Sequence, residues 1–240
     1  MIFIVWVESM CNMRCSYCYE QNTSSYKPLE HASASDIVSF IKQQTLDLDY
    51  QEAVLIDFHG GEPLMNPDKI LDIVRLSKNH LSHLDLQFSM TTNGTLLSQK
   101  KSREIIELLD SLSISLDGNK TVHDSNRKLI NNPKSSYDLI LHNIKNLDET
   151  QLSKIRIRMS VDSKTAYELV SSITHIVDLG FKQIVAGIVY SDNSWCIDSL
   201  SCLHKNMLIV KEKFKNSNVK ISFLEKTKLK NSEIADSINS

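Results

Sequence analysis

Short apolar runs of strand length recur along the chain and are separated by amphipathic stretches. The runs are rich in Ile, Val, Leu and Phe, which pack well on the pleated surface of a sheet. They lie at residues 2–7, 53–58, 84–90, 112–116, 154–161 and 182–189. A shorter run at 219–224 predicts a seventh strand at the open edge of the sheet.

The stretches between these runs have the spacing of helices that bury one face. They lie at residues 34–47, 67–80, 98–110, 136–148, 165–179 and 201–215. Ser33 or Ser35, and Ser98, stand where helix starts are expected, because a serine side chain can accept a hydrogen bond from the first turn. Gly180 follows an apolar helix end and predicts its C-terminal stop.

Strands and helices that alternate in this way favour parallel strands joined by right-handed crossovers. Six such units are too few to close an eight-stranded barrel. We therefore expect an α/β fold, a partial (β/α)6 TIM-like barrel. No linker rich in Pro and Gly divides the chain, so we expect one core domain over residues 1–224. Residues 225–240 are polar and predict a loose tail or a truncated linker.

Composition and charge restrict the possible partners of the protein more than they restrict its fold. A hydrophobic content of 41% and a formal net charge of −2 are ordinary for a globular protein and give no electrostatic reason to expect nucleic acid as a partner. No apolar run approaches the ~18 residues that span a bilayer, and the first ten residues lack the features of a signal peptide. We expect a cytoplasmic protein with no membrane partner.

Three of the five cysteines are crowded into "CNMRCSYCYE", residues 11–20, directly after the first predicted strand. A disulfide framework spreads its cysteines through the fold, so a cluster in a reducing compartment favours metal binding. A closed structural zinc site or an ordinary ferredoxin cluster takes four ligands, which leaves the fourth position here unexplained. Cys196 and Cys202 have poor spacing for metal ligands and are interpreted as ordinary buried or half-buried thiols.

Every distinctive polar stretch follows a predicted strand. After the cysteines come "HGGEPL", "TTNGT", "DGNKTVHDSNR", "DSKT" and "YSDNSW". If the strands are parallel, these loops meet at the carboxyl end of the barrel, where active sites are built. Taken alone, "HGG" and "NG" are equally consistent with tight turns, and the glycines with close approach of a ligand to the backbone.

Taken together, these motifs resemble the radical S-adenosylmethionine (SAM) superfamily. The cysteines fit its Cys-x3-Cys-x2-Cys signature, with the aromatic Tyr17 before the third cysteine. "FHGGEPL", "TTNGTLL", "SISLDG", "HDSNR" and "SSYDLILHNIKNL" resemble the subgroup of anaerobic sulfatase-maturating enzymes and ribosomal-peptide maturases. The resemblance runs from about residue 3 to about residue 190 with the motifs in order.

The resemblance implies an answer to the question of the fourth ligand. Cys11, Cys15 and Cys18 would bind three irons of a [4Fe–4S] cluster, and the amino and carboxylate groups of SAM would occupy the fourth. Reductive cleavage of SAM would yield a 5′-deoxyadenosyl radical that abstracts hydrogen from a peptide or protein substrate. A flavodoxin or ferredoxin would supply the electron.

Other site residues follow from the same resemblance. Backbone atoms at Gly60, Gly61 and Glu62 would line the SAM amino group, while Ser115 and Arg127 would hold its carboxylate and ribose region. An Arg suits a carboxylate because it can make two charge-assisted hydrogen bonds at once. The remaining contacts would be Thr92 and Asn93 beside the ribose, Ile188 near the adenine, and Asp117 on the substrate side or behind it.

The chain departs from the subgroup at both ends. Many members carry a C-terminal extension with seven cysteines that binds auxiliary clusters, whereas only Cys196 and Cys202 follow the core here, so that domain is either absent or has been removed. Without auxiliary clusters, we expect a redox-neutral outcome such as epimerisation. Met1 leads straight into the first strand, so we expect a leader peptide to dock on the polar tail or on a separate protein. Alternatives are a glycyl-radical-enzyme activase, an enzyme acting on a small molecule, or a non-catalytic iron–sulfur or zinc scaffold.

Overall fold

The computed structural model describes residues 1–22 and 32–222. Within these ranges the main sheet has seven strands in the order β1-β3-β4-β5-β7-β8-β9, and every neighbouring pair is parallel. This confirms the α/β prediction of six strand–helix units with a short edge strand. The strands are β1 (Ile2–Glu8), β3 (Ala53–Gly60), β4 (Asp85–Thr92), β5 (Ser111–Ser115), β7 (Ile155–Val161), β8 (Gln183–Ile188) and β9 (Lys220–Ile221).

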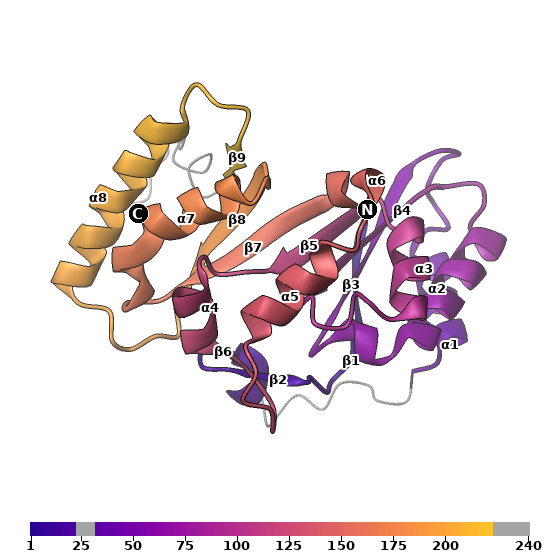
Figure 1. Ribbon diagram of the computed structural model, residues 1–240. Helices are drawn as coiled ribbons and strands as arrows, with labels where there is room; N and C mark the ends of the chain where they lie inside the picture. Colours follow the sequence, from indigo (N-terminus) through magenta and orange to yellow (C-terminus); the bar gives the residue numbers. More distant parts are fainter. Residues whose placement is uncertain (23–31, 223–240) are drawn as a thin grey trace.

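Helices cover one face of this sheet (Figure 1). Moving along the sheet from β1 to β9, the main helices are α1 (Ala34–Gln44), α2 (Pro67–His80), α3 (Lys100–Leu108), α5 (Ser136–Ile144), α7 (Leu169–Asp178) and α8 (Ile197–Phe214). Shorter segments are α4 (Lys120–Asn126), α6 (Glu149–Ser153) and the 3-10 turns η1 (Tyr19–Asn22), η2 (Pro63–Met65) and η3 (Thr165–Glu168). The sequence did not predict α4 or α6.

The two faces of the central strands differ in chemistry. On β7, Ile155, Ile157 and Met159 are buried against the helices, whereas the intervening Arg156 and Arg158 point to the opposite face. This alternation follows from the two-residue repeat of a strand. The helix side is therefore the apolar core, and the other, concave side is polar on the central strands, whereas β1 carries apolar side chains there.

Helix ends follow the sequence signals in part. Ser33 caps α1 through a reciprocal arrangement with Asp36, and Gly180 adopts φ +96° just after α7. Ser98 was wrong as a helix start, since Gln99 occupies the cap position of α3 without a side-chain hydrogen bond. Helix α8 begins at Ile197, four residues earlier than predicted.

A second, two-stranded sheet was not predicted. The antiparallel strands β2 (Met13–Cys15) and β6 (Arg127–Leu129) pair Cys15 with Arg127 and lie below the main sheet in Figure 1. Each has only three residues, too few to show an alternating pattern. This small sheet ties the cysteine segment to the loop that follows β5.

The main sheet does not close into a barrel, because β1 and β9 stand at its two ends without pairing. The exposed face of β1 carries Ile2, Ile4 and Trp6, which are 66%, 62% and 36% exposed. The predicted tail at 225–240 lies outside the described residues, as does the end of the predicted strand at 219–224. No helix among the described residues is long and apolar enough to cross a membrane.

Candidate active site

A cavity of about 1010 Å³ lies at the carboxyl ends of the parallel strands. Loops from distant parts of the chain contribute to its wall, as expected for a β/α barrel mouth. The predicted site residues that line it are Cys11, Cys15, Cys18, Gly60, Gly61, Thr92, Asn93, Ser115, Arg127 and Ile188. Glu62 and Asp117 are not among the lining residues.

The three cysteines are free thiols on one wall of this cavity. The Cys11 sulfur accepts a hydrogen bond from the Met13 amide at 3.4 Å and lies 3.8 Å from Nδ2 of Asn93. The Cys15 sulfur lies 4.0 Å from Nη1 of Arg127. Burial raises the pKa of the Cys15 thiol to about 11, against the opposing effect of Arg127. A thiolate at this position therefore needs a bound cation to stabilise it.

Three thiols around one cavity suit a polynuclear cluster, in which each sulfur binds a different iron. A closed structural zinc site takes four protein ligands. Across residues 1–22 and 32–222, no three His, Cys, Asp or Glu side chains are placed to hold one metal ion together.

Gly60 and Gly61 are required by close packing against the cysteine segment. A Cβ atom at Gly60, which has φ +138°, would lie 2.1 Å from the Glu8 carbonyl oxygen, and one at Gly61 would lie 2.4 Å from the Met10 carbonyl oxygen. The Gly61 amide donates to Glu8 at 2.8 Å. The sequence interpretation, close approach of a ligand, therefore misses a second cause: these glycines let β3 dock against the chain that leads to Cys11.

Glu62 is an internal anchor. Its carboxylate is fully buried and accepts hydrogen bonds from the Leu64 amide (3.1 Å), the Thr92 hydroxyl (2.6 Å) and the Asn93 amide (2.7 Å). Burial raises the pKa of Glu62, and these hydrogen bonds act in the opposite direction. The side chain thus joins the loops after β3 and β4, and only the neighbouring backbone reaches the cavity.

Thr92 and Asn93 line the cavity, but their side chains also hold the wall together. Besides the contact with Cys11, Nδ2 of Asn93 donates to Asn12 at 2.8 Å, and its Oδ1 accepts from the Thr95 hydroxyl at 2.6 Å. The Asn12 side chain completes the loop by donating to the Thr95 hydroxyl at 2.8 Å. The cysteine segment is thereby fixed to the end of β4.

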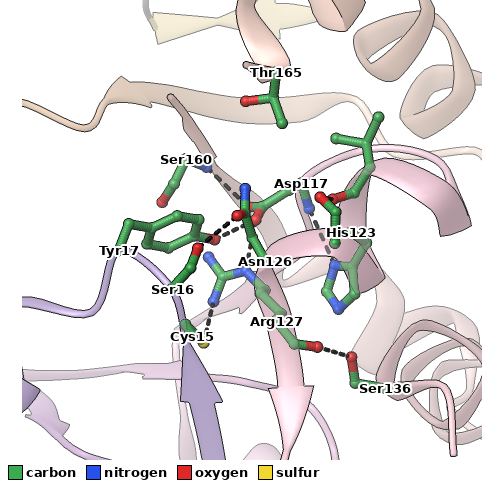
Figure 2. A network of polar contacts seen from close by, with 12 residues as sticks. Cys15, Ser16, Tyr17, Asp117, His123, Asn126, Arg127, Ser136, Ser160 and Thr165 are labelled. Carbon is green, nitrogen blue, oxygen red and sulfur yellow. Dashed lines mark hydrogen bonds and ion pairs between the residues drawn. The ribbon is translucent and has the colours of Figure 1, made fainter. Parts of the chain in front are cut away.

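Arg127 stands between Cys15 and Asp117 in a buried polar network (Figure 2). Its Nε donates to Asp117 at 2.9 Å, and its guanidinium lies 5.3 Å from the ring centre of Tyr17. Burial lowers the pKa of Arg127, but the charge of Asp117 and its hydrogen bond, together with Tyr17 and Cys15, outweigh this effect and raise the pKa. The guanidinium is therefore permanently charged and held at the cavity wall.

Asp117 lies behind the wall, which is the second of the two placements expected for it. It is 1% exposed, and its carboxylate also accepts hydrogen bonds from the Tyr17 hydroxyl and from the Ser160 amide at 2.9 Å. Both oxygens are thus engaged by the protein (Figure 2). Its function is to position Arg127 and Tyr17.

His123 completes this network from below. Its Nδ1 accepts a hydrogen bond from the Asp117 amide at 3.3 Å, which places the proton of the neutral ring on Nε2. Nε2 is buried without a hydrogen-bond partner, and burial lowers the pKa of His123 to about 4. The ring is therefore neutral near pH 7.

Sequence reasoning missed a group of polar residues on the concave face. His59 lines the cavity, and its Nε2 bonds Asp57 at 2.8 Å, while Ser89 donates to the same carboxylate at 2.5 Å. Arg158 also lines the cavity, with Nη1 3.4 Å from the Thr91 hydroxyl. The available signal is the alternation of polar and apolar residues inside the predicted strands, which the sequence analysis did not use.

Comparison with known proteins agrees with this geometry. The family model described as the Radical SAM superfamily matches residues 9–189. An uncharacterized protein of Methanocaldococcus jannaschii is 33% identical over 137 residues, 57% of this chain and 45% of that protein. An S-adenosylmethionine-dependent nucleotide dehydratase of Pseudoalteromonas ulvae is 38% identical over 120 residues, 45% of this chain and 37% of that protein.

A cysteine-type anaerobic sulfatase-maturating enzyme of Clostridium novyi is 28% identical over 144 residues, 58% of this chain and 38% of that enzyme. The matched region thus spans less than half of each of these three relatives. The fold is similar to that of native anSMEcpe with bound AdoMet, with a TM-score of 0.78 and 21% identity over 92% of this chain and 64% of that one. It is also similar to Streptococcus suis SuiB bound to precursor peptide SuiA, with a TM-score of 0.58 and 13% identity over 92% of this chain and 48% of that one. Because the family model covers most of the chain, including every cysteine, glycine and arginine of the predicted site, this protein belongs to the radical SAM superfamily.

Proposed function

We propose that this protein uses a [4Fe–4S] cluster, held by Cys11, Cys15 and Cys18, to cleave SAM and to modify a peptide or protein. Enzymes of this superfamily use that cluster and SAM. The observation that carries the proposal is the gathering of three free thiols in one cavity with the glycine, asparagine and arginine residues of the predicted SAM site. Three sulfur ligands leave one position open for a small molecule, as in catalytic zinc sites.

The donor set fits the cluster in chemistry as well as in number. N–H groups of Met13 and Asn93 point at the Cys11 sulfur, and Arg127 approaches the Cys15 sulfur. Such contacts to cluster sulfurs tune the reduction potential. When bound, the cluster and SAM supply one-electron chemistry that ends in removal of a hydrogen atom from the substrate.

The residues of the chain bind and orient SAM. Arg127, fixed through Nε by Asp117, is suited to the SAM carboxylate, and the Ser115 hydroxyl lies on the same wall. Backbone atoms of Gly60 and Gly61 would accept the amino group. Thr92, Asn93 and Ile188 would line the ribose and adenine.

A peptide or protein substrate is supported by the nature of the relatives. Sulfatase-maturating enzymes are among the proteins of similar sequence, and SuiB is described with a bound precursor peptide. The cavity volume of about 1010 Å³ stands at the upper end of small-molecule sites, which leaves space for a substrate group beside SAM. We further propose that a flavodoxin or ferredoxin supplies the electron, and that a separate protein presents the peptide.

A nucleotide substrate is the second candidate, because the dehydratase of Pseudoalteromonas ulvae has 38% identity in the matched region. The two candidates share the SAM chemistry and differ in the molecule that donates hydrogen. Incubation with deuterated nucleoside triphosphates would transfer deuterium into 5′-deoxyadenosine only if a nucleotide is the substrate.

The first experiment is anaerobic reconstitution with iron and sulfide, followed by dithionite and SAM. We expect 5′-deoxyadenosine from the native protein and none from Cys15→Ala. The matched control is Cys202→Ala, because Cys202 is a free thiol in α8 that does not line the cavity. If the fully loaded native protein forms no 5′-deoxyadenosine, the chain is a scaffold and the proposal is wrong.

A further inference from the structure

Arg158 projects from β7 onto the concave face of the sheet and lines the cavity. It pairs in register with Ser115 of β5, and its Nη1 lies 3.4 Å from the hydroxyl of Thr91 on β4. The Arg158 guanidinium therefore extends across β5 and reaches β4. It can do so because β5 presents only the short side chains of Ser111, Ser113 and Ser115 to this face.

Arg158 has no carboxylate partner among the described residues, in contrast to Arg127, which is bonded to Asp117. Asp57 is near enough for the charge of Arg158 to help lower its pKa, but its two oxygens already bond to Ser89 and His59. Thr91 offers only a neutral hydroxyl at a long distance. The guanidinium thus retains most of its hydrogen-bonding capacity toward the cavity.

The cavity as a whole has an excess of positive charge. The described residues that line it include three arginines (Arg14, Arg127 and Arg158) and one acidic residue, Glu20. The arginine side chains provide sites on this wall for anionic groups of a ligand. An arginine is also the side chain best suited to two-point binding of a carboxylate or phosphate.

Arg158 comes from β7, which carries none of the residues proposed to bind SAM. It pairs in register with Ser115 of β5, so its backbone stands at the same depth of the sheet as that proposed SAM contact. An experiment must therefore separate a contact of Arg158 with the substrate from a contact with SAM.

We propose that Arg158 binds a carboxylate of the substrate, so that the modified peptide carries an acidic residue near the reacting position. This inference rests on the proposed function and specifies its substrate. The Thr91 hydroxyl can donate or accept a hydrogen bond at the edge of the same site. The pair formed by His59 and Asp57 makes up the opposite side. A phosphate group of a nucleotide would be recognised by the same chemistry, so the test must separate the two sources.

The first test is protection of arginine from phenylglyoxal in the reconstituted protein, with SAM present throughout and adducts located by mass spectrometry. We expect N-acetylglutamate N-methylamide to slow labelling of Arg158, and its glutamine analogue to have no effect. Arg156, on the same face of β7 but outside the cavity lining, is the internal reference. Protection by SAM alone would assign Arg158 to the cofactor, and equal protection of Arg156 would indicate charge screening; either result overturns the proposal.

The second test uses two pools of random peptides that differ only in a central Glu or Gln, with enrichment on the reconstituted protein measured by mass spectrometry. Loss of a charge-assisted contact corresponds to enrichment of the Glu pool by on the order of tenfold. We expect this preference to disappear in Arg158→Gln, to be partly retained in Arg158→Lys, and to be unchanged in Arg156→Gln. No Glu preference in the native protein, or strong protection by GTP without protection by the glutamate probe, contradicts the peptide carboxylate.

The assignment of Arg158 and the proposed function can be disproved separately. If the native protein forms 5′-deoxyadenosine but shows no preference between Glu and Gln, the assignment of Arg158 is wrong and the radical SAM function stands. If no 5′-deoxyadenosine forms, the proposed function itself is wrong.

Discussion

Two buried carboxylates beside the cavity, those of Glu62 and Asp117, each accept several hydrogen bonds from the protein. Glu62 joins the loops after β3 and β4, and Asp117 holds Arg127 and Tyr17. A buried carboxylate is stable only when such donors replace water. Both residues therefore define the shape of the site without lining it.

Replacement of Glu62 by Gln tests the anchoring role. The NH2 group of the Gln side chain would point either at the Asn93 amide or at the Thr92 hydroxyl and the Leu64 amide. In both orientations, hydrogen-bond donors would face each other in a buried site. We expect a loss of about 2–4 kcal/mol in the free energy of unfolding, measured with urea. Glu104→Gln, at an exposed position in α3, is the control and should change stability by less than about 0.5 kcal/mol.

His123 predicts a specific pH dependence of stability. Its folded pKa is about 4, below the unfolded value near 6.5, so its contribution is complete above pH 6.5 and is lost as the pH falls toward 4. Between pH 7 and pH 5 this loss is about 2 kcal/mol. Protonation would also place a proton on Nδ1, against the Asp117 amide.

The measurement is urea unfolding of the native protein and of His123→Asn at both pH values. An Asn side chain can keep an acceptor near the Asp117 amide without titrating, so the difference between pH 7 and pH 5 should shrink by about 2 kcal/mol. His80→Asn, at the exposed end of α2, should retain the native pH dependence. Equal pH dependence in His123→Asn and the native protein would contradict the assignment.

At the residue scale, the sequence identified site residues where a family motif specifies the residue type. It did not show in which direction a side chain points. The cysteines, Gly60, Gly61, Ser115 and Arg127 could be selected because their resemblance to a family pattern is specific. The roles of the side chains of Glu62 and Asp117 could not, because their partners come from other strands. Burial and hydrogen bonding of a carboxylate depend on those tertiary contacts.

At the scale of elements, two separate contacts hold in place the cysteine segment, the stretch that carries Cys11 and Cys15. One is the contact of Gly60 and Gly61 with residues 8–10, and the other is the pairing of β2 with β6. Between them they fix both ends of the stretch that carries Cys11 and Cys15. The geometry of the three thiols thus depends on β3 and on the loop after β5.

Gly60→Ala tests the first attachment. Its Cβ would lie 2.1 Å from the Glu8 carbonyl oxygen, so the cysteine segment must move away from β3. We expect reduced iron content after reconstitution, measured by iron and sulfide analysis, together with lower stability. Gly180→Ala is a matched control, because Gly180 also has positive φ but no atom within 4 Å of the added Cβ.

The difference between these variants isolates the steric contact. Gly180→Ala should cost about 1 kcal/mol from backbone strain alone, and Gly60→Ala about 2–3 kcal/mol more. Iron content should be unchanged in Gly180→Ala. Normal iron content in a folded Gly60→Ala protein would show that the contact does not position the thiols.

Elements of the main sheet were predictable because each has a long, consistent pattern. Runs such as 53–58 and 154–161 lie within observed strands or extend them by a residue or so, since large apolar residues stand at every second position in them. Strands β2 and β6 and the short helices α4 and α6 have three to seven residues, and tertiary contacts decide their conformation. Of these short elements, β2 and β6 contribute Met13, Arg14, Cys15 and Arg127 to the cavity wall.

For the whole molecule, we expect removal of iron to increase local unfolding at the site and to leave the sheet folded. The core between the sheet and its helices consists of aliphatic side chains such as Ile56, Ile114 and Ile157, none of which contacts the cysteines through a hydrogen bond. Metal binding adds stability chiefly where its ligands are ordered. Chelation should therefore act locally.

Hydrogen exchange with mass spectrometry measures this locality. On chelation of iron we expect exchange over residues 9–18 to accelerate by about tenfold or more, with no change in α7 and β8. Cys15→Ser should reproduce the chelated pattern, and Cys202→Ser should behave as the native protein. Uniform acceleration across the sheet would show instead that the cluster supports the global fold.

The exposed apolar face of β1 has a consequence for the lifetime of a reactive species formed at the cavity. Ile2, Ile4 and Trp6 are exposed on this strand, which is an end strand of the sheet among the described residues. A substrate that packs against these side chains would exclude water from this end of the sheet. A radical formed before the substrate has bound would then be quenched by solvent.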